Sequence, residues 1–138
     1  RPSVEISFHA GILRHRPDVG AVLHFQSNAA TTCGCFAEPV ANYNMTPEVP
    51  AYIGPVAHVP YLPPGSAELA EAVVEAMGGH DLAQLASHGQ VVVGPTTNDA
   101  IERAAFFETV CRILLDGGDR VAPLSDRAVR ELLAKRRA

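Results

Sequence analysis

Residues 19–26, VGAVLHFQ, restrict the fold of this chain more than any other segment. Apolar residues dominate the segment, and successive side chains of an extended strand point to opposite faces. Val22, His24 and Gln26 then share one face, so an imidazole and an amide lie side by side in an otherwise apolar strand. The opposite face carries Val19, Ala21, Leu23 and Phe25. The segment therefore predicts a buried strand with a polar pair at its end.

A helical pattern precedes this strand. Ser3 is expected to be the N-cap of the helix, because a serine side chain accepts hydrogen bonds from the free amides of a first turn. Pro17 is expected to end the helix, because proline lacks an amide hydrogen. The spacing of three and four residues that marks one helical face is seen at Ile6, His9, Ala10 and Leu13.

The rest of the chain alternates between helical and extended patterns. The small residues of 28–37 predict a short helix, and the proline-rich stretch that follows predicts a loop with a strand in YIGPVAHVPY. LAQLAS and QVVVG predict two strands around a tight turn. Three more helices are expected. The first is capped by Ser66 and has the apolar stripe Leu69, Val73 and Met77. The second is capped by Thr97 or Asn98 and runs to about Asp116, and the third is capped by Ser125 and covers 126–135.

Without an internal repeat or a linker, this order predicts a single α/β layered domain over residues 1–138. A hydrophobic content of 47% and a charged content of 19% are ordinary for a globular protein. The net charge of −4 offers no basic field for nucleic acid. No apolar run approaches the roughly 20 residues that cross a bilayer, so no membrane partner is expected.

Two smaller features bear on the environment of the chain. Its three cysteines are an odd number, which argues against a disulfide framework and favours a reducing compartment, so a cytoplasmic location is expected. Cys33-Gly34-Cys35 is interpreted as small core residues rather than thiolate ligands. The basic residues Arg130, Lys135, Arg136 and Arg137 alternate with apolar ones and are interpreted as a solvated helix face.

Three side chains form a candidate metal site. His24 and Gln26 converge from alternate positions of one strand, which is the arrangement that two ligands of a first-row metal need. His88 precedes Gly89 in the predicted turn, where a glycine permits close approach, and is the candidate third ligand. A lone histidine is more often structural, and His15 and His80 are interpreted in that way.

Glu5 has two readings. A glutamate in a first helical turn commonly serves the helix dipole, but it could also act as a general base if the fold places it beside the metal. Lys135 is the only lysine of the chain, which nearly rules out a Schiff-base mechanism for carbon–carbon chemistry. A metal that polarises a carbonyl would then be the remaining electron sink.

Four segments together resemble the class II aldolase/adducin family, which includes fuculose-phosphate and rhamnulose-phosphate aldolases and ribulose-phosphate 4-epimerases. The segments are PSVEISFHAGILRHRPDVGAVLHFQ, VPYLPPGSAELAEAV, SHGQVVVG and AIERAAFFETV, in the order of the family and spanning residue 2 to about 115. The resemblance implies a layered αβα fold with a central, mostly antiparallel sheet. It also implies that the chain, which starts at Arg1 without an initiator Met, lacks the N-terminal segment of the family domain.

The resemblance further implies roles for site residues. The acid/base carboxylate of the family matches Glu5, and its first and third zinc-ligand histidines match His24 and His88. The second strand histidine of the family is Gln26 here. Because an amide oxygen is a weaker ligand than an imidazole, the site either binds zinc less tightly, prefers manganese, cobalt or magnesium, recruits a further ligand such as His58, or holds no ion. His9 is expected to pack near the site without binding the ion.

Substrate handling also departs from the family pattern. Sugar-phosphate aldolases hold the phosphate with an N-terminal loop, which this chain lacks, and with two serines before the glutamate. Ser3 matches one serine and is the expected substrate contact, but Val4 stands at the other position. The substrate is therefore expected to be a small sugar phosphate or another hydroxy-carbonyl compound.

Two functional hypotheses follow. In the first, the chain is a metal-dependent lyase that cleaves or forms a carbon–carbon bond beside a carbonyl through a metal-stabilised enediolate, with zinc as the expected ion and a homotetramer as the expected assembly. An epimerase or a decarboxylase would use the same site. In the second, the chain is a non-catalytic assembly module, as in adducin. The replacement by Gln26 favours the second hypothesis, and the retention of Glu5, His24 and His88 favours the first.

Overall fold

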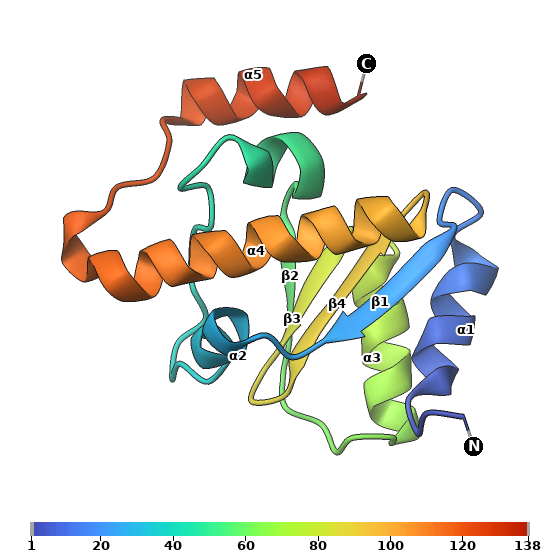
Figure 1. Cartoon of the computed structure of the whole chain (residues 1–138). Helices are drawn as coiled ribbons and strands as arrows, with labels where there is room; N and C mark the ends of the chain where they lie inside the picture. Colours follow the sequence, from blue (N-terminus) through green and yellow to red (C-terminus); the bar gives the residue numbers. More distant parts are fainter. Residues whose placement is uncertain (1, 138) are drawn as a thin grey trace.

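The structure is a computed structural model that describes residues 2–137. Its centre is a four-stranded sheet with the strand order β1-β4-β3-β2 (Figure 1). β4 runs antiparallel to both of its neighbours, whereas β2 and β3 are parallel, so the predicted mostly antiparallel sheet is confirmed. The strands are β1 (Ala21–Phe25), β2 (Val56–Val59), β3 (Leu82–Leu85) and β4 (Gly89–Gly94).

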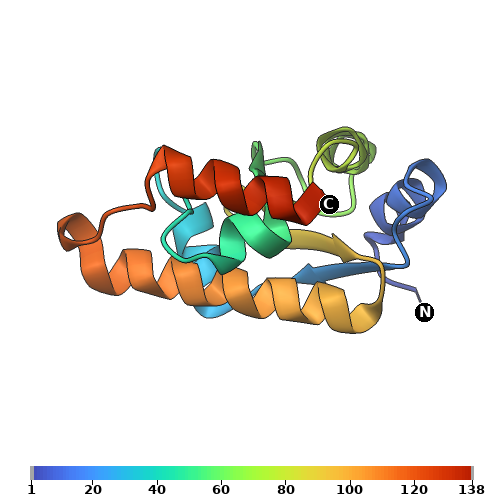
Figure 2. The same cartoon turned by 90° about the horizontal axis from the view of Figure 1, so that it is seen from above.

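Helices cover both faces of this sheet, which confirms the predicted layered αβα arrangement (Figure 2). α1 (Ile6–His15) and α3 (Ala67–Met77) pack on one face, and α2 (Asn28–Gly34) and α4 (Thr97–Gly117) pack on the other. The π-helical turn η1 (Val49–Ile53) and the 3₁₀ turn η2 (Gly118–Arg120) lie on the α4 side, and α5 (Asp126–Arg137) runs over η1 (Figure 1). Among residues 2–137, no helix combines the length and apolar character needed to cross a membrane.

The predicted alternation of the first strand is confirmed, with one exception. Leu23 and Phe25 pack against the core beneath α4, while Val22 packs against the core beneath α1 and α3. The strand itself is shorter than predicted, and Val19 joins the core of Val22 rather than that of Leu23. The chain bends at Gly20, where a Cβ atom would lie 2.0 Å from the Pro95 carbonyl oxygen, so this position has no room for a side chain.

The first helix does not bury the whole face marked by Ile6, His9, Ala10 and Leu13. α1 buries Phe8 and Ile12, whereas Ile6 and Leu13, on the predicted stripe, are 51% and 47% exposed. Both stripes are apolar, and the helix turns the one with the aromatic ring toward α3. Ser3 is not the N-cap either, because Glu5 occupies that position, and the Ser3 hydroxyl accepts a hydrogen bond from the Glu5 amide.

The other helix caps are as predicted or displaced by one residue. Ser66 and Ser125 accept hydrogen bonds from the amides three residues later, at 3.1 and 3.3 Å. The cap of α4 is Thr96 rather than Thr97 or Asn98, because Thr96 and Asp99 form a reciprocal capping box. The cap therefore lies one residue before the first predicted position, where the Asp99 side chain can bond back to Thr96.

The predicted solvated face of the C-terminal helix is only partly correct. Arg130 and Lys135 are exposed, but Arg136 forms an ion pair with Asp81, which precedes β3. Asp81 also accepts hydrogen bonds from Arg16 at 2.9 Å and Arg103 at 3.2 Å. One carboxylate therefore links α1, α4 and α5 at the end of the sheet where β3 begins. The side chain of Arg137 lies outside the described residues.

Glu108 of α4 fixes the start of α2, directly after the histidine strand. Its carboxylate accepts hydrogen bonds from the Ser27 hydroxyl at 2.6 Å and from the amides of Ala29 and Ala30, both at 2.9 Å. Burial raises the pKa of Glu108, but these three hydrogen bonds outweigh burial and leave the pKa below its usual value. A side chain of α4 thus supplies the N-terminal cap that α2 does not supply itself.

A Glu108→Gln variant is expected to be about 1–2 kcal/mol less stable than the wild type at pH 7, the magnitude of a lost helix cap. Because the folded-state pKa is lowered, this stabilisation is present above the unfolded pKa and is lost as pH falls through the folded pKa. Urea unfolding at several pH values would show the difference between the two proteins shrinking below about pH 4.3. A difference that stays constant with pH would contradict a role for the ionised carboxylate.

Candidate metal centre

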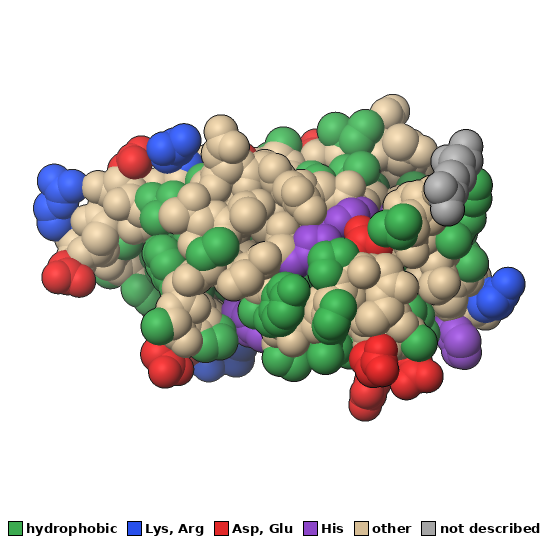
Figure 3. Space-filling view, turned by 90° about the horizontal axis from the view of Figure 1, so that it is seen from below, with side chains coloured by type: hydrophobic (Ala, Val, Ile, Leu, Met, Phe, Trp, Pro, Cys, Tyr) green, Lys and Arg blue, Asp and Glu red, His purple; other side chains and the backbone are tan. Residues whose placement is uncertain are grey.

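Three polar side chains from separate elements converge at the end of the sheet opposite to Asp81. Glu5 lies just before α1, His24 lies on β1, and His88 lies in the turn between β3 and β4. One ligand atom from each residue lies within 4.8 Å of the others. On the face seen in Figure 3, histidine and acidic side chains lie together in a hollow among apolar ones. The structure thus brings together three side chains that are spread over more than 80 residues of the sequence.

The histidine on β1 is held in one orientation. His24 Nδ1 lies 2.9 Å from the Gln90 carbonyl oxygen on β4 and donates its hydrogen to it. In a neutral ring the lone pair is then on Nε2. That nitrogen points to Glu5 and lies 2.8 Å from Oε2. The rings of His24 and the buried Phe8 of α1 also lie nearly perpendicular to each other, with their centroids 5.5 Å apart.

The other two groups are buried with atoms left unpaired. The Glu5 residue is 6% exposed and the His88 side chain is 8% exposed. Glu5 Oε1 lies 3.3 Å from His88 Nε2, yet Oε1 and His88 Nδ1 have no hydrogen-bond partner. The two histidine rings meet edge to face, with their centroids 5.1 Å apart. Buried polar atoms without partners are rare, and a bound ion is one of the physical explanations for such a pair.

The donor set suits a divalent metal. A carboxylate oxygen and a ring lone pair are both acceptors, so at 2.8 Å they require a proton or a cation between them. Two imidazole nitrogens and one carboxylate oxygen are ligands that zinc and similar ions accept, and three protein ligands leave a coordination position open. Glu5, His24 and His88 together therefore fit a divalent metal ion, so Glu5 is a candidate ligand beside the two histidines.

Gln26 shares the face of His24 but follows the end of β1 and is exposed. A Cβ atom placed on Gly89 would lie 2.7 Å from Gln26 Cγ, 2.7 Å from the Phe25 carbonyl oxygen and 3.4 Å from His24 Cε1. The absence of a side chain at Gly89 therefore leaves room for Gln26, the Phe25 carbonyl and His24, whereas the sequence prediction considered only the approach of an ion. That Gln26 itself binds the ion stays a prediction.

Two residues predicted to assist the site lie near Glu5. His9 stacks on Phe8, and burial together with the charge of His24 lowers its pKa, although Glu5 acts in the opposite direction. Ser3 is exposed and directly precedes the site, two residues from Glu5. Both positions are compatible with the predicted roles, packing for His9 and substrate contact for Ser3, and both roles stay predictions.

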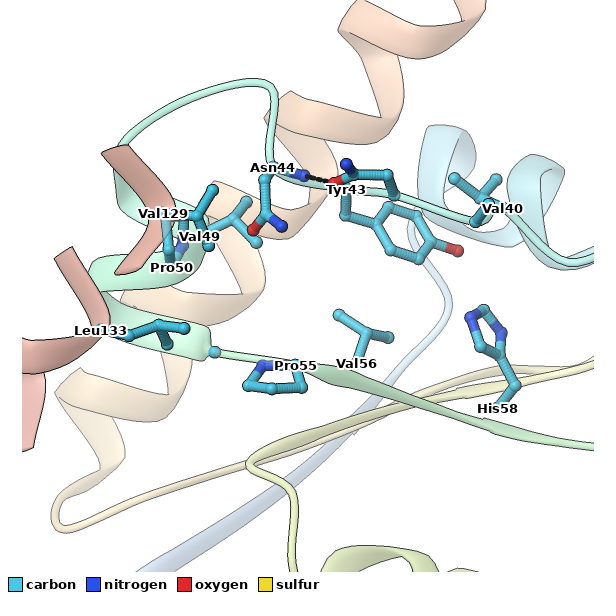
Figure 4. A pocket seen from close by; sticks show the side chains of 13 residues that line it. Val40, Tyr43, Asn44, Val49, Pro50, Pro55, Val56, His58, Val129 and Leu133 are labelled. Carbon is cyan, nitrogen blue, oxygen red and sulfur yellow. Dashed lines mark hydrogen bonds between the residues drawn. The ribbon is translucent and has the colours of Figure 1, made fainter. Parts of the chain in front are cut away.

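The remaining histidines lie away from the metal group. His58, the suggested substitute ligand, lies on the edge strand β2, where its ring stacks near that of Tyr43 beside a cavity of about 340 Å³ (Figure 4). Burial lowers the pKa of His58. His15 and His80 bond the carbonyl oxygens of the preceding helical turn, which confirms their structural interpretation. Within the Cys33-Gly34-Cys35 motif, Cys33 is buried as interpreted from the sequence, whereas Cys35 is exposed. Cys111 is also buried.

The family described as "Class II Aldolase and Adducin N-terminal domain" matches residues 1–115. The chain belongs to the class II aldolase and adducin family. This membership confirms the resemblance found in the sequence, and the match covers the three residues of the candidate metal group.

Curated members of this family and a solved structure are similar to most of the chain. A 3-oxo-tetronate 4-phosphate decarboxylase of Pectobacterium atrosepticum is 32% identical over 87% of the chain and 56% of its own length. An L-fuculose phosphate aldolase of Methanococcus vannielii is 30% identical over 82% of the chain and 60% of its own length. The structure of YgbL from Escherichia coli superposes with a TM-score of 0.92 at 28% identity, over 96% of this chain and 66% of that one. The chain therefore spans little more than half the length of these curated class II aldolase relatives.

Proposed function

We propose that the chain carries the metal-binding and acid/base part of a class II aldolase-type lyase, which breaks or forms a carbon–carbon bond beside a carbonyl. One observation carries the proposal: a buried carboxylate faces the lone pair of a fixed histidine ring at 2.8 Å, with a second histidine beside it. This arrangement is costly to bury without a cation. It is well suited to a divalent ion.

Glu5, His24 and His88 would hold the ion, and Gln26 is the proposed further ligand at the exposed rim. A divalent ion bound here supplies Lewis acidity, which polarises a substrate carbonyl and stabilises negative charge on its oxygen. The Gln90 carbonyl keeps His24 in the tautomer that offers Nε2. Zinc is the proposed ion, with manganese, cobalt and magnesium as alternatives if Gln26 weakens zinc binding.

Glu5 is the proposed acid/base group. When a bond beside the carbonyl breaks, its electron pair moves through the adjacent carbon to the carbonyl oxygen and leaves an enolate, and that carbon must then receive a proton. In aldol cleavage a hydroxyl proton must also be removed first. Oε1 of Glu5 has no hydrogen-bond partner, so it is free to hold and deliver such a proton. Its burial limits competing exchange with water.

The proposed substrate is a small phosphorylated hydroxy-carbonyl compound. Decarboxylation of a 3-oxo sugar acid phosphate is the first reaction to test, because the similarity to 3-oxo-tetronate 4-phosphate decarboxylase extends over 87% of the chain. Aldol cleavage of a ketose phosphate is the second, because a fuculose phosphate aldolase matches at nearly the same identity. The two reactions share the enolate stage, so one site serves either.

Turnover assays with two substrates test this proposal. The protein, supplied with Zn²⁺ or Mn²⁺, is incubated with 3-oxo-tetronate 4-phosphate or L-fuculose 1-phosphate, and carbon dioxide or aldehyde release is measured. We expect turnover of one substrate and a loss of at least about 100-fold in His88→Ala. Turnover that survives both His88→Ala and metal chelation would refute the metal-dependent mechanism. A protein that binds no ion and turns over neither substrate would favour the adducin-like assembly module.

A Gln26→His variant is expected to bind zinc about tenfold more tightly than the wild type, because an imidazole is a stronger zinc ligand than an amide oxygen. Competition titration with a chromophoric chelator measures the affinity. Gln26→Leu, which has a similar size and no ligand atom, is the matched control and should not gain affinity. An unchanged zinc affinity in Gln26→His would mean that position 26 does not reach the ion.

A further inference from the structure

The turn that carries His88 contains an unusual backbone conformation. Ser87 has φ 52° and is the one non-glycine residue with a positive φ among residues 2–137. The His88 amide donates to the Leu85 carbonyl oxygen at 3.2 Å, so Ser87 occupies the third position of a four-residue turn. A positive φ at this position is the pattern of a type II turn, which favours glycine or asparagine. Serine is therefore held there against its own preference.

Packing against α2 holds Ser87 in this conformation. The Ser87 amide donates to the Gly34 carbonyl oxygen, at the end of α2, at 2.9 Å. A Cβ atom on Gly34 would lie 2.1 Å from Gln84 Nε2, so glycine allows α2 to come this close to β3. The Gln84 side chain in turn donates to the Ala30 carbonyl oxygen at 2.8 Å, which ties the same helix to the sheet. A strained conformation persists only where its surroundings determine it in this way.

The direction of the next residue depends on this backbone. The His24 ring is fixed by a hydrogen bond to Gln90, but His88 Nδ1 has no partner, so no equivalent bond orients the His88 ring. We propose that Ser87 is a positioning residue, whose left-handed backbone directs the His88 ring toward Glu5 and His24. Ser87 is exposed and reaches α2 through its amide, so the role belongs to the backbone rather than to the hydroxyl.

Substitutions that differ in their tolerance of positive φ test this inference, which rests on the proposed metal function. Co²⁺ is titrated into the wild type and the variants, and its visible spectrum reports affinity and ligand geometry. Ser87→Asn and Ser87→Gly should bind Co²⁺ within about threefold of the wild type with the same spectrum. Ser87→Val should bind at least about tenfold more weakly with an altered spectrum, the loss typical when a group that orients a ligand is removed. Ser87→Val that binds as tightly as Ser87→Asn would overturn the proposal.

Two further measurements separate the possible failures. If Ser87→Val does not fold, Ser87→Ala replaces it and should bind Co²⁺ about threefold more weakly than Ser87→Asn, and equal affinity would overturn the proposal. If the wild type binds no Co²⁺, the proposed function fails, and the Ser87 proposal is judged on the ¹⁵N resonances of the His88 ring in the metal-free protein. Those resonances should move in Ser87→Val and stay in place in Ser87→Asn. Unmoved resonances in Ser87→Val would then reject the positioning role.

Discussion

Glu5→Gln is expected to lower turnover about 10²–10⁴-fold, the contribution of a positioned acid/base group. Glutamine has nearly the same size and can fill the same buried position, but its neutral amide cannot accept and return a proton near neutral pH. An amide oxygen can still face a metal ion, so the ion held by His24 and His88 should remain bound. Steady-state kinetics on the substrate identified by the assays above, together with metal analysis of the purified variant, measures both effects.

Glu71→Gln is the matched control for this experiment. Glu71 is an exposed residue of α3, so the same chemical change should leave turnover at the wild-type level. Turnover of Glu5→Gln within tenfold of the wild type would remove Glu5 from the acid/base role. Loss of the metal from Glu5→Gln would instead make Glu5 mainly a ligand.

Asp81→Asn is expected to lower the free energy of unfolding by about 3 kcal/mol, because it leaves three arginines without their shared counterion. The Asp81 side chain is 15% exposed, and Arg16, Arg103 and Arg136 approach it from three helical elements. The midpoint of urea unfolding measures the change. Co²⁺ affinity should stay within about twofold of the wild type, because Asp81 lies at the opposite end of the sheet from the metal group.

Asp18→Asn provides the control for burial. Asp18 also pairs with Arg16, at 2.7 Å, but its side chain is 63% exposed. Exposed ion pairs contribute about 0–1 kcal/mol, so this variant should lose less than about 1 kcal/mol. Equal losses in Asp81→Asn and Asp18→Asn would show that the buried network of arginines does not stabilise the fold beyond a surface pair.

Local patterns were sufficient to predict the strands and most of the helices, whereas the arrangement of the sheet followed from the family resemblance. Alternation identified β1 and its polar face, and the turn before Gly89 identified the β3–β4 hairpin that carries His88. The same patterns failed where two solutions are locally equivalent. α1 has two apolar stripes, and the tertiary contact with α3, not the sequence of the helix, selects the one with Phe8.

Local sequence patterns could not predict the polar contacts between residues that are far apart in the sequence. Arg136 resembles a solvated residue of an amphipathic helix, and its pairing with Asp81 depends on how α5 crosses η1. The unusual φ of Ser87 was missed because serine does not signal a left-handed conformation as glycine or asparagine does. Glu5 was expected beside the metal as a base, and its contact with both histidines could be found only once the fold was known.

The metal content of the purified protein tests the central claim most directly. Protein prepared without chelator is analysed for all divalent metals and then titrated with Zn²⁺ and Mn²⁺, alongside His24→Ala and His88→Ala. The account predicts about one equivalent per chain, either retained or taken up, and a loss of that uptake in both variants. Less than about a tenth of an equivalent, with none taken up on titration, would contradict a metal centre formed by Glu5, His24 and His88.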